Sequence, residues 1–261
     1  MKQKIINGIL YSAAGSLWWG IIGVFYFKFV SFVSPIELVI HRTIWTAFIL
    51  IFTTTYLSRW DLFLSIIKNY KNVLVLSVTG ILILANWGTW IYAVVTDRLI
   101  DASYGYYIFP ILSVFYGILF FKEPKTKSKI LSVALVFLAI LILLFNHDSI
   151  PWVGLIVAIT WSTYNLIRKK INISVDIGLF IETLLMSPIA ILVFYFIVKE
   201  GNNHFSFNDL SLAFVLFLAG IMTLAPLYLY LKGVEKAGLG TSGMIFFIAP
   251  TGQFLLGLFY F

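Results

Sequence analysis

The sequence predicts an all-α membrane protein, an inverted-repeat helix bundle with nine spans present of an expected ten (5+5). Three observations predict this fold class. Of 261 residues, 61% are hydrophobic and only 11% are charged, whereas soluble domains are about 45–50% apolar and about 25% charged. The apolar residues form nine long runs. The two halves of the chain also match one another at an offset of 140 to 142 residues.

Each apolar run is expected to be a helix, because about 20 mostly apolar residues span a bilayer and unpaired backbone groups are too costly in hydrocarbon. The first run follows Lys2 and Lys4 and exceeds the roughly 7–15 residues of a signal-peptide core, so we expect it to be retained. The second begins after Ser34 and Pro35, a pattern typical of a helix start. The predicted spans lie at about 5–29, 36–57, 73–96, 102–121, 128–145, 151–167, 177–198, 210–232 and 239–261.

The basic residues between the runs predict the orientation. With the N-terminus in the cytoplasm, fourteen of the 18 Lys and Arg residues fall on the inner side and three on the outer side, while Arg42 lies within a span. Basic residues favour the cytoplasmic side. We therefore expect a cytoplasmic N-terminus in a multi-pass protein of the cell (inner or plasma) membrane. This explains the net charge of +7 without a nucleic acid partner.

The internal match predicts two repeats, residues 1–146 and 147–261. Each would hold five helices, and because five is odd the second copy crosses the membrane in the opposite sense, as in many secondary transporters. The partner of the fifth helix would lie beyond residue 261, so we expect the second repeat to lack its final helix. The matched pairs that carry the repeat include Gly80 with Gly220, Pro110 with Pro250, Trp19 with Trp161, and His41 with Glu182.

Two neighbouring residues of the second span are site candidates. A titratable side chain within a span indicates function by default, and histidine titrates near neutral pH, so His41 is a candidate for the substrate pathway or for proton coupling. Arg42 could bind an anionic substrate group, or it could pair with Glu37 or Asp101 and hold the bundle together. Glu37 itself suits the first turn of a helix, where the helix dipole favours a carboxylate.

Three further polar residues lie within predicted spans. Because equivalent helices run in opposite directions, we expect His41 toward the outer side and Glu182 toward the inner side, one polar element for each half of the pathway. Asn86 could contact substrate or join two helices by hydrogen bonds. Asn165 could likewise contact substrate or join two helices, but it lies closer to the cytoplasmic end of its span.

Tyr107 and two prolines are the remaining candidates. Tyr107 lies one turn before Pro110, where a kink would free a backbone carbonyl. It could line the pathway or belong to an interfacial aromatic belt. Pro110 and Pro250 are expected to bend equivalent helices. Residues 238–243 match G-x-G-x-x-G, but they join two spans, so helix termination and capping explain them better than a nucleotide site.

Six strings spread over the chain carry a family resemblance: HRTIW at 41–45, NW at 86–87, DASYGY at 101–106, RKK at 168–170, IET at 181–183 and APT at 249–251. The chain resembles the drug/metabolite transporter (DMT) superfamily, specifically its EamA-type, RarD-like permeases. The resemblance implies ten helices, of which the fifth and tenth are peripheral, and a central pathway lined by the others. It also implies export or exchange of small solutes, and it adds Trp87 to the candidate pathway residues.

These observations predict a secondary-active transporter that moves a small metabolite or drug-like solute by alternating access, with protons as a candidate coupling ion. The expected partners are a small-molecule substrate and the lipid bilayer, and a homodimer stays open. The alternatives are a channel-like facilitative pore and a non-transporting membrane scaffold or subunit. An enzyme is disfavoured because no nucleophile–base set or paired catalytic carboxylates occur. With no cysteine and scattered histidines, we expect no metal site and no cofactor.

Overall fold

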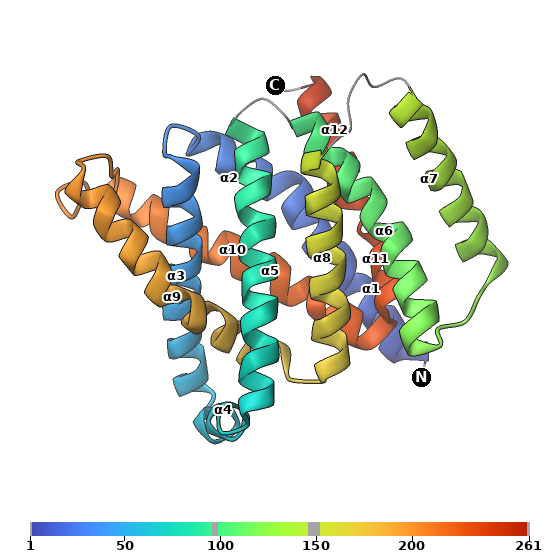
Figure 1. Cartoon of the computed structure of the whole chain (residues 1–261), viewed down its shortest axis with the longest axis horizontal. Coiled ribbons are helices and arrows are strands. Elements are labelled where there is room, and N and C mark those ends of the chain that lie inside the picture. Colours follow the sequence, from blue (N-terminus) through green and yellow to red (C-terminus); the bar gives the residue numbers. More distant parts are fainter. Residues whose placement is uncertain (1, 96–98, 146–151, 260–261) are drawn as a thin grey trace.

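The computed structural model describes residues 2–95, 99–145 and 152–259, and within these residues it contains helices and no strands. Figure 1 shows their arrangement. In chain order they are α1 (Lys2–Leu17), the π-helix η1 (Trp18–Ile22), α2 (Gly23–Phe29), α3 (Pro35–Tyr56), α4 (Trp60–Ile67), α5 (Tyr70–Val95), α6 (Leu99–Phe121), α7 (Lys127–Phe145), α8 (Trp152–Ile171), α9 (Val175–Lys199), α10 (Leu210–Ala237), α11 (Leu239–Ile245) and α12 (Ile248–Phe259).

The all-helical prediction is confirmed for the described residues. One helix, or several consecutive helices, covers most of every predicted span, and six of these segments are long and apolar enough to cross a membrane. Three details were not predicted. A turn of π-helix interrupts the first segment, the short helix α4 follows the second, and the last segment breaks between α11 and α12. The predicted boundary between the repeats, at 146/147, lies outside the described residues.

Local capping determines where the long helices begin and end. At the start of α3, the Ser34 hydroxyl accepts the Glu37 N–H at 3.3 Å, and Pro35 occupies the first turn, where its missing N–H costs nothing. At the start of α10, Asp209 accepts the N–H of Leu212 at 2.9 Å. The same helix ends at Gly238, whose φ of +96° suits a residue without a Cβ.

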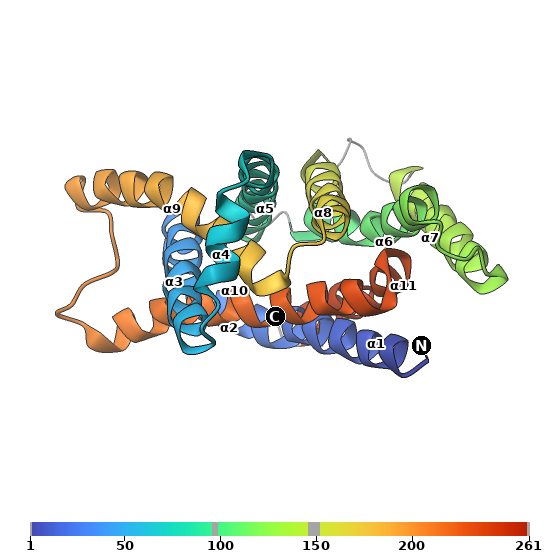
Figure 2. The ribbon, with the colours of Figure 1, turned by 90° about the horizontal axis from the view of Figure 1, so that it is seen from below.

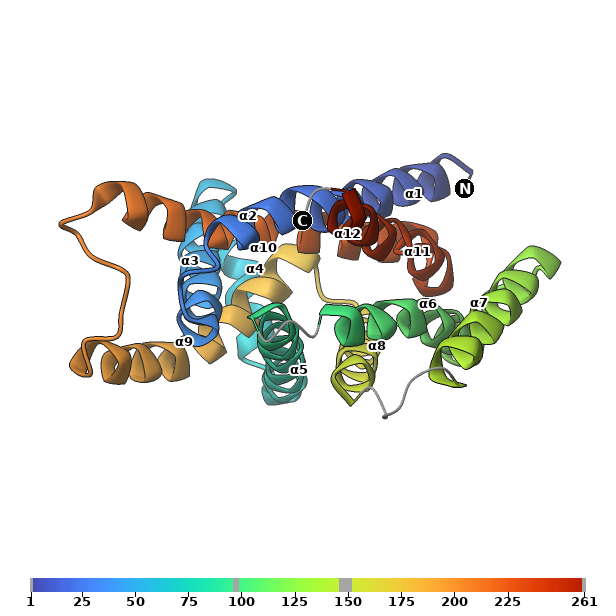
Figure 3. The same ribbon diagram turned by 90° about the horizontal axis from the view of Figure 1, so that it is seen from above.

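Figures 2 and 3 show two layers of helices with a third element between them. The first layer contains α1, α2, α10, α11 and α12. The second contains α5, α6, α8 and α9, and α7 lies at its edge beside α6. Helix α3 joins the layers, because it packs against both α10 and α9. Each layer therefore combines helices from the two halves of the sequence.

The polarity of the molecule matches a membrane environment. Large apolar side chains such as Phe52, Leu74 and Ile191 are exposed on its outside, while Arg42 and Glu182 are buried among the helices. Unpaired polar groups are expensive in hydrocarbon, so spanning helices are expected to expose apolar side chains and to bury their charged ones.

Two glycines allow close helix crossings around α3 and α9. A Cβ at Gly220 of α10 would lie 2.7 Å from the Trp45 Cβ, whereas a Cβ at Gly80 of α5 would lie 3.3 Å from the Met186 Cγ. Small residues let helix backbones approach closely in a bilayer. The contact at Gly220 is the tighter one.

Candidate functional site

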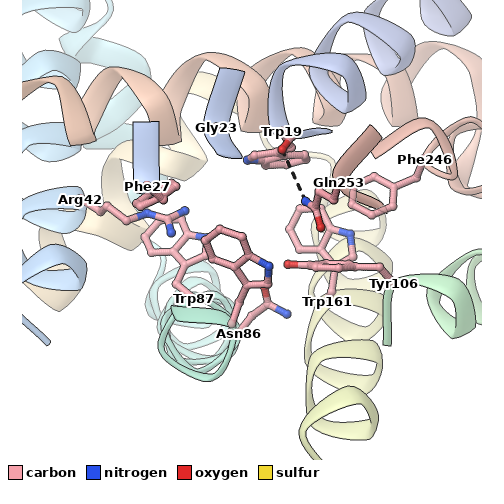
Figure 4. Close-up of a pocket in the computed structure, with 11 residues that line it drawn as sticks. Trp19, Gly23, Phe27, Arg42, Asn86, Trp87, Tyr106, Trp161, Phe246 and Gln253 are labelled. Carbon is pink, nitrogen blue, oxygen red and sulfur yellow. Dashed lines mark hydrogen bonds between the residues drawn. The ribbon is translucent and has the colours of Figure 1, made fainter. Parts of the chain in front are cut away.

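A central cavity lies between the two layers (Figure 4). Its volume is about 40 Å³, which is room for little more than water. Most of its walls are aromatic. The lining residues are Trp19, Gly23, Phe27, Arg42, Asn86, Trp87, Trp90, Tyr106, Trp161, Phe246 and Gln253.

Arg42 is the charged residue of the cavity. Its side chain is almost fully buried, and its Nε donates to the Thr223 hydroxyl at 2.8 Å. The guanidinium carbon lies 4.5 Å from the ring centre of Trp87 and 4.9 Å from that of Phe27, so both rings make cation–π contacts. Among the described side chains no carboxylate forms an ion pair with Arg42. Glu37, one of its two predicted partners, is bound elsewhere, and the Asp101 side chain lies outside the described ones.

The aromatic wall comes from both layers. Trp19 of η1 meets Trp161 of α8 edge-to-face, with their ring centres 5.4 Å apart. Tyr106 of α6 lies 5.7 Å from Phe246, the residue after α11. Figure 4 shows Trp19 and Phe27 on one side of the cavity and Trp87 and Asn86 on the other. Such surfaces suit a flat or apolar portion of a ligand.

Asn86 and Gln253 supply the neutral polar groups of the lining. The Asn86 amide nitrogen donates to the Val157 carbonyl and to the Thr160 hydroxyl, each at 3.1 Å, so it joins α5 to α8. The Gln253 amide donates to the Trp19 carbonyl at a longer 3.4 Å (Figure 4). Asn86 therefore both joins helices and lines the cavity.

His41 lies outside the cavity, in a cluster at the start of α3. The buried Glu37 carboxylate accepts the N–H groups of His204 and Phe205 at 2.8 and 3.0 Å, and it lies 3.0 Å from the His204 ring nitrogen Nδ1. His41 Nε2 lies 3.6 Å from Glu37, and its Nδ1 accepts from the Trp45 indole at 3.1 Å. This cluster attaches the connection between α9 and α10 to the start of α3.

Glu182 forms a second buried network, on α9. Its carboxylate accepts the Thr79 hydroxyl at 2.6 Å and the Tyr164 hydroxyl at 3.1 Å, and it lies 3.3 Å from Arg168 Nε. The network connects α5, α8 and α9. His41 and Glu182 thus have separate partners, and neither lines the central cavity.

Comparison with known proteins identifies the family. The model of the EamA-like transporter family matches residues 6–145, more than half of the chain. The chain belongs to the EamA-like transporter family.

Individual relatives agree with this assignment. The chain is 31% identical to Protein RarD of Escherichia coli (strain K12) over 255 residues, which cover 98% of this chain and 86% of the relative. It is 33% identical to the uncharacterized transporter YojE of Bacillus subtilis (strain 168), over 97% of this chain and 85% of the relative. The chain is also 32% identical to an uncharacterized transporter of Vibrio cholerae, over 98% of this chain and 85% of the relative. The predicted resemblance is confirmed, and this EamA-like chain is a multi-pass membrane protein.

The cavity of this EamA-like chain contains three of the seven predicted pathway residues, Arg42, Asn86 and Trp87. Four others lie elsewhere. The positions of His41 and Glu182 are given above. Tyr107 packs against Phe247 with ring centres 6.1 Å apart, and Asn165 donates to the Trp161 carbonyl at 2.8 Å.

The two predicted kink prolines differ in their surroundings. Helix α6 continues through Pro110, whereas the chain leaves helical geometry at 246–247, just before Pro250. The helix that contains Pro110 is thus unbroken and the segment before Pro250 is interrupted, while the predicted bends themselves stay predictions.

Sequence reasoning missed the residues that form most of the wall. Trp19 and Trp161 were recognised as repeat partners but not as site residues. Tyr106, Trp90 and Phe246 were not singled out as pathway residues, because aromatic residues are common throughout the chain. The match of Trp19 with Trp161 between the two halves of the sequence was the available signal, since these two residues meet at the cavity.

Glu123 of this EamA-like chain links the two layers near the C-terminal end of α6. Its carboxylate accepts the N–H groups of Leu239 and Gly240 at the start of α11, at 2.6 and 3.1 Å, and it pairs with Lys169 of α8 at 2.8 Å. The anion position of the G-x-G-x-x-G string is thus filled by the protein's own carboxylate. Partial burial alone would raise the pKa of Glu123, but Lys169, Lys129 and the Leu239 N–H outweigh it and lower the pKa below its usual 4.5.

Proposed function

We propose that this chain is a secondary-active transporter that moves a small organic anion with a flat or apolar portion across the cell membrane by alternating access. The observation that carries the proposal is the central cavity, where a buried guanidinium with no described carboxylate partner faces an aromatic wall between two layers of helices.

The charge of Arg42 supports an anionic substrate. A buried charge is costly unless it is paired, and a carboxylate or similar group could form two parallel hydrogen bonds with a guanidinium. The Thr223 hydroxyl accepts a hydrogen bond from the Nε of Arg42 only. The rings of Trp87 and Phe27 stabilise the cation without neutralising it. A bound anion would therefore complete the site, and the aromatic rings would contact the rest of the solute.

The pattern of helix contacts supports an inverted repeat. When each helix is exchanged for its expected repeat partner, contacting pairs map onto contacting pairs. The pair α1 with α10 maps onto α8 with α5, and α3 with α10 maps onto α9 with α5. Expected partners also meet one another at the cavity, as Trp19 meets Trp161 and Tyr106 meets Phe246. Such contacts are expected close to a twofold axis.

The small size of the cavity supports a carrier that changes shape. Ligand sites usually measure about 300–1,000 Å³, far more than the 40 Å³ of this cavity. A solute could enter only if the layers separate on one side. We propose that the layers rock about the cavity and open it to each side in turn, as inverted repeats do in other secondary transporters.

The proposed topology keeps a cytoplasmic N-terminus and nine spans. The excess of basic residues on one side supports the cytoplasmic N-terminus. In Figure 1, α1 begins at the bottom of the molecule and α12 ends at the top, as an odd number of spans requires. The plasma membrane is the proposed location. In this orientation Glu123 and Arg168 lie toward the cytoplasm, and Glu37 and His204 lie toward the outside.

Counterflow in proteoliposomes tests the proposal. Vesicles loaded with a panel of aromatic and aliphatic carboxylates should take up the matching labelled carboxylate faster than empty vesicles, and the corresponding methyl esters should not compete. Arg42→Gln should abolish this exchange. Arg42→Lys keeps the charge but loses the planar fork, so it should retain at most a small part of it.

The same assay separates the alternatives. A pore would pass solute without stimulation from the opposite side, and a scaffold would give no flux. Equal exchange by Arg42→Gln and the unmodified protein would refute the anion site. We retain protons as the proposed coupling ion, with His41 as the first residue to substitute. An imposed pH gradient that leaves the flux unchanged would refute proton coupling.

A further inference from the structure

A groove of about 450 Å³ lies between α3, α5 and α9, and its volume is in the range of ligand sites. Helix α9 packs against both of the other helices. The walls of the groove come from residues within 34–43, 84–92 and 189–193, and most of the side chains that line it are apolar. The groove therefore suits hydrocarbon better than a polar solute.

The groove opens on the outside of the molecule. Ile36, Tyr92 and Ile189 line it, and each of these side chains is about half exposed or more. A Cβ on Gly88 would meet no surrounding atom of the described residues within 4 Å, so α5 faces open space at this position. Because the outside of this multi-pass membrane protein is apolar, lipid hydrocarbon reaches the groove.

Neighbouring residues of α3 and α5 line the groove and the central cavity. On α3, Arg42 lines the cavity and Thr43 lines the groove. On α5, Trp87 lines the cavity and Gly88 lines the groove. Successive residues of a helix point about 100° apart. The groove and the cavity therefore lie against adjacent faces of the same two helices.

A smaller space of about 10 Å³ connects the linings of the groove and the cavity. It shares Thr43 and Leu84 with the groove and Trp87 with the cavity. This space is too small for a solute, so the three side chains form a partition. The Trp87 ring also lies against the Arg42 guanidinium, 4.5 Å from ring centre to guanidinium carbon (Figure 4). The partition thus separates lipid from the buried cation of the cavity.

We propose that the groove is a lateral portal through which an amphipathic organic anion passes between the lipid bilayer and the central cavity. The anionic group would bind Arg42 while the apolar tail extends past Trp87 into the groove. A rotamer change at Leu84 or Trp87 would open the partition without moving a helix. This inference rests on the proposed function, and it narrows the substrate class to anions whose apolar portion partitions into lipid.

A thiol in the central cavity tests the portal without a known substrate. The full chain has no native cysteine, so Gln253→Cys provides a single one in proteoliposomes. Its labelling is measured with N-dodecylmaleimide, which dissolves in the bilayer, and with a sulfonated maleimide, which stays in water. Adding Gly88→Leu fills open space in the groove. It should slow labelling by the alkyl reagent several-fold and leave labelling by the sulfonated reagent unchanged. Val193→Phe, which fills the groove from α9, should have the same effect.

Ala85→Leu is the matched control, because it adds a leucine to the exposed surface of α5, one turn before Gly88 and outside the lining. It should leave both labelling rates unchanged. Equal labelling by the alkyl reagent in Gly88→Leu and Ala85→Leu would overturn the portal and leave a groove filled by lipid tails alone. Equal slowing of both reagents by Gly88→Leu would also overturn it, as would a Gln253→Cys chain that the alkyl reagent does not label.

Counterflow separates the portal from the transport activity. Sulfonates keep their charge and cross pure lipid slowly, so benzenesulfonate and an octylbenzenesulfonate serve as the polar and amphipathic probes. Arg42→Gln should abolish the exchange of both, whereas Gly88→Leu should slow the octyl compound more than benzenesulfonate. Exchange that responds to Arg42→Gln, with labelling that ignores Gly88→Leu, would refute the portal alone. Labelling that responds to Gly88→Leu, without exchange of any anion, would support the route and refute the proposed function.

Discussion

Removing one partner of the buried ion pair between Glu182 and Arg168 is expected to destabilise the fold strongly. Replacing Glu182 with Gln leaves the Arg168 guanidinium buried without its counter-charge. At the observed 3.3 Å, two unit charges interact by about 5 kcal/mol at an effective dielectric constant of about 20. Breaking a buried pair by removing one partner typically costs about 3–5 kcal/mol. The Gln amide can still accept from Thr79 or Tyr164, so we expect the lower end, about 3 kcal/mol.

Thermal unfolding in a mild detergent measures this loss. For a chain of this length, about 3 kcal/mol corresponds to a fall in Tm of about 6–12 °C. The double variant Glu182→Gln with Arg168→Met removes both charges. It should recover most of the loss, because replacing a whole buried pair is often close to neutral. The coupling between the two substitutions should therefore reach about 2 kcal/mol.

Two results would refute this reasoning. The first is a Glu182→Gln variant as stable as the unmodified protein. The second is a double variant whose loss equals the sum of the single losses. If Glu182→Gln kept its stability but lost exchange, Glu182 would act in the pathway, as the sequence predicted.

Two further predictions concern packing and pH. Gly220→Ala should lower the Tm more than Gly80→Ala, because the new methyl group meets the Cβ and backbone of Trp45 in the first case and the flexible Met186 side chain in the second; equal losses in thermal melts would contradict the structure. Because the pKa of Glu123 is lowered on folding, its contribution is present above pH 4.5 and is lost as the pH falls through its folded pKa. The difference in Tm between the unmodified protein and Glu123→Gln should thus shrink below about pH 4.5, whereas a difference that grows in acid would contradict the sign.

The helices were predictable because hydrophobic runs and capping residues are local signals. Ser34 with Pro35 marked the start of α3, as the structure has it. The glycine-rich string at 238–243 marked the junction that follows α10, although that helix runs to Ala237, beyond the predicted end at 232. The π-helical turn at Trp18–Ile22 was not predictable, because no residue pattern in that segment marks it. At Pro250 the sequence predicted a bend but not the non-helical residues at 246–247 that separate α11 from α12. The segments η1 and α12 pack against each other, a long-range contact that the sequence of either segment alone does not reveal.

The site was predictable only where a residue is chemically unusual for its surroundings. Arg42 and Asn86 were recognised because a charge or an amide within a span is rare. Trp161 and Phe246 were missed because their role depends on which helices meet, not on their own chemistry. His41 and Glu182 show the opposite case, since each polar side chain has partners on neighbouring helices and lies outside the central cavity.

The most direct test of alternating access uses one cysteine and needs no known substrate. The chain has no native cysteine, so Gln253→Cys places a unique thiol in the central cavity. Its labelling by a membrane-impermeant thiol reagent is measured from each side, in right-side-out and inside-out vesicles, with and without Glu123→Gln. Glu123 links the layers on the proposed cytoplasmic side, so its loss should speed labelling from the inside and slow labelling from the outside. Two rates that change in the same direction, or do not change, would contradict alternating access.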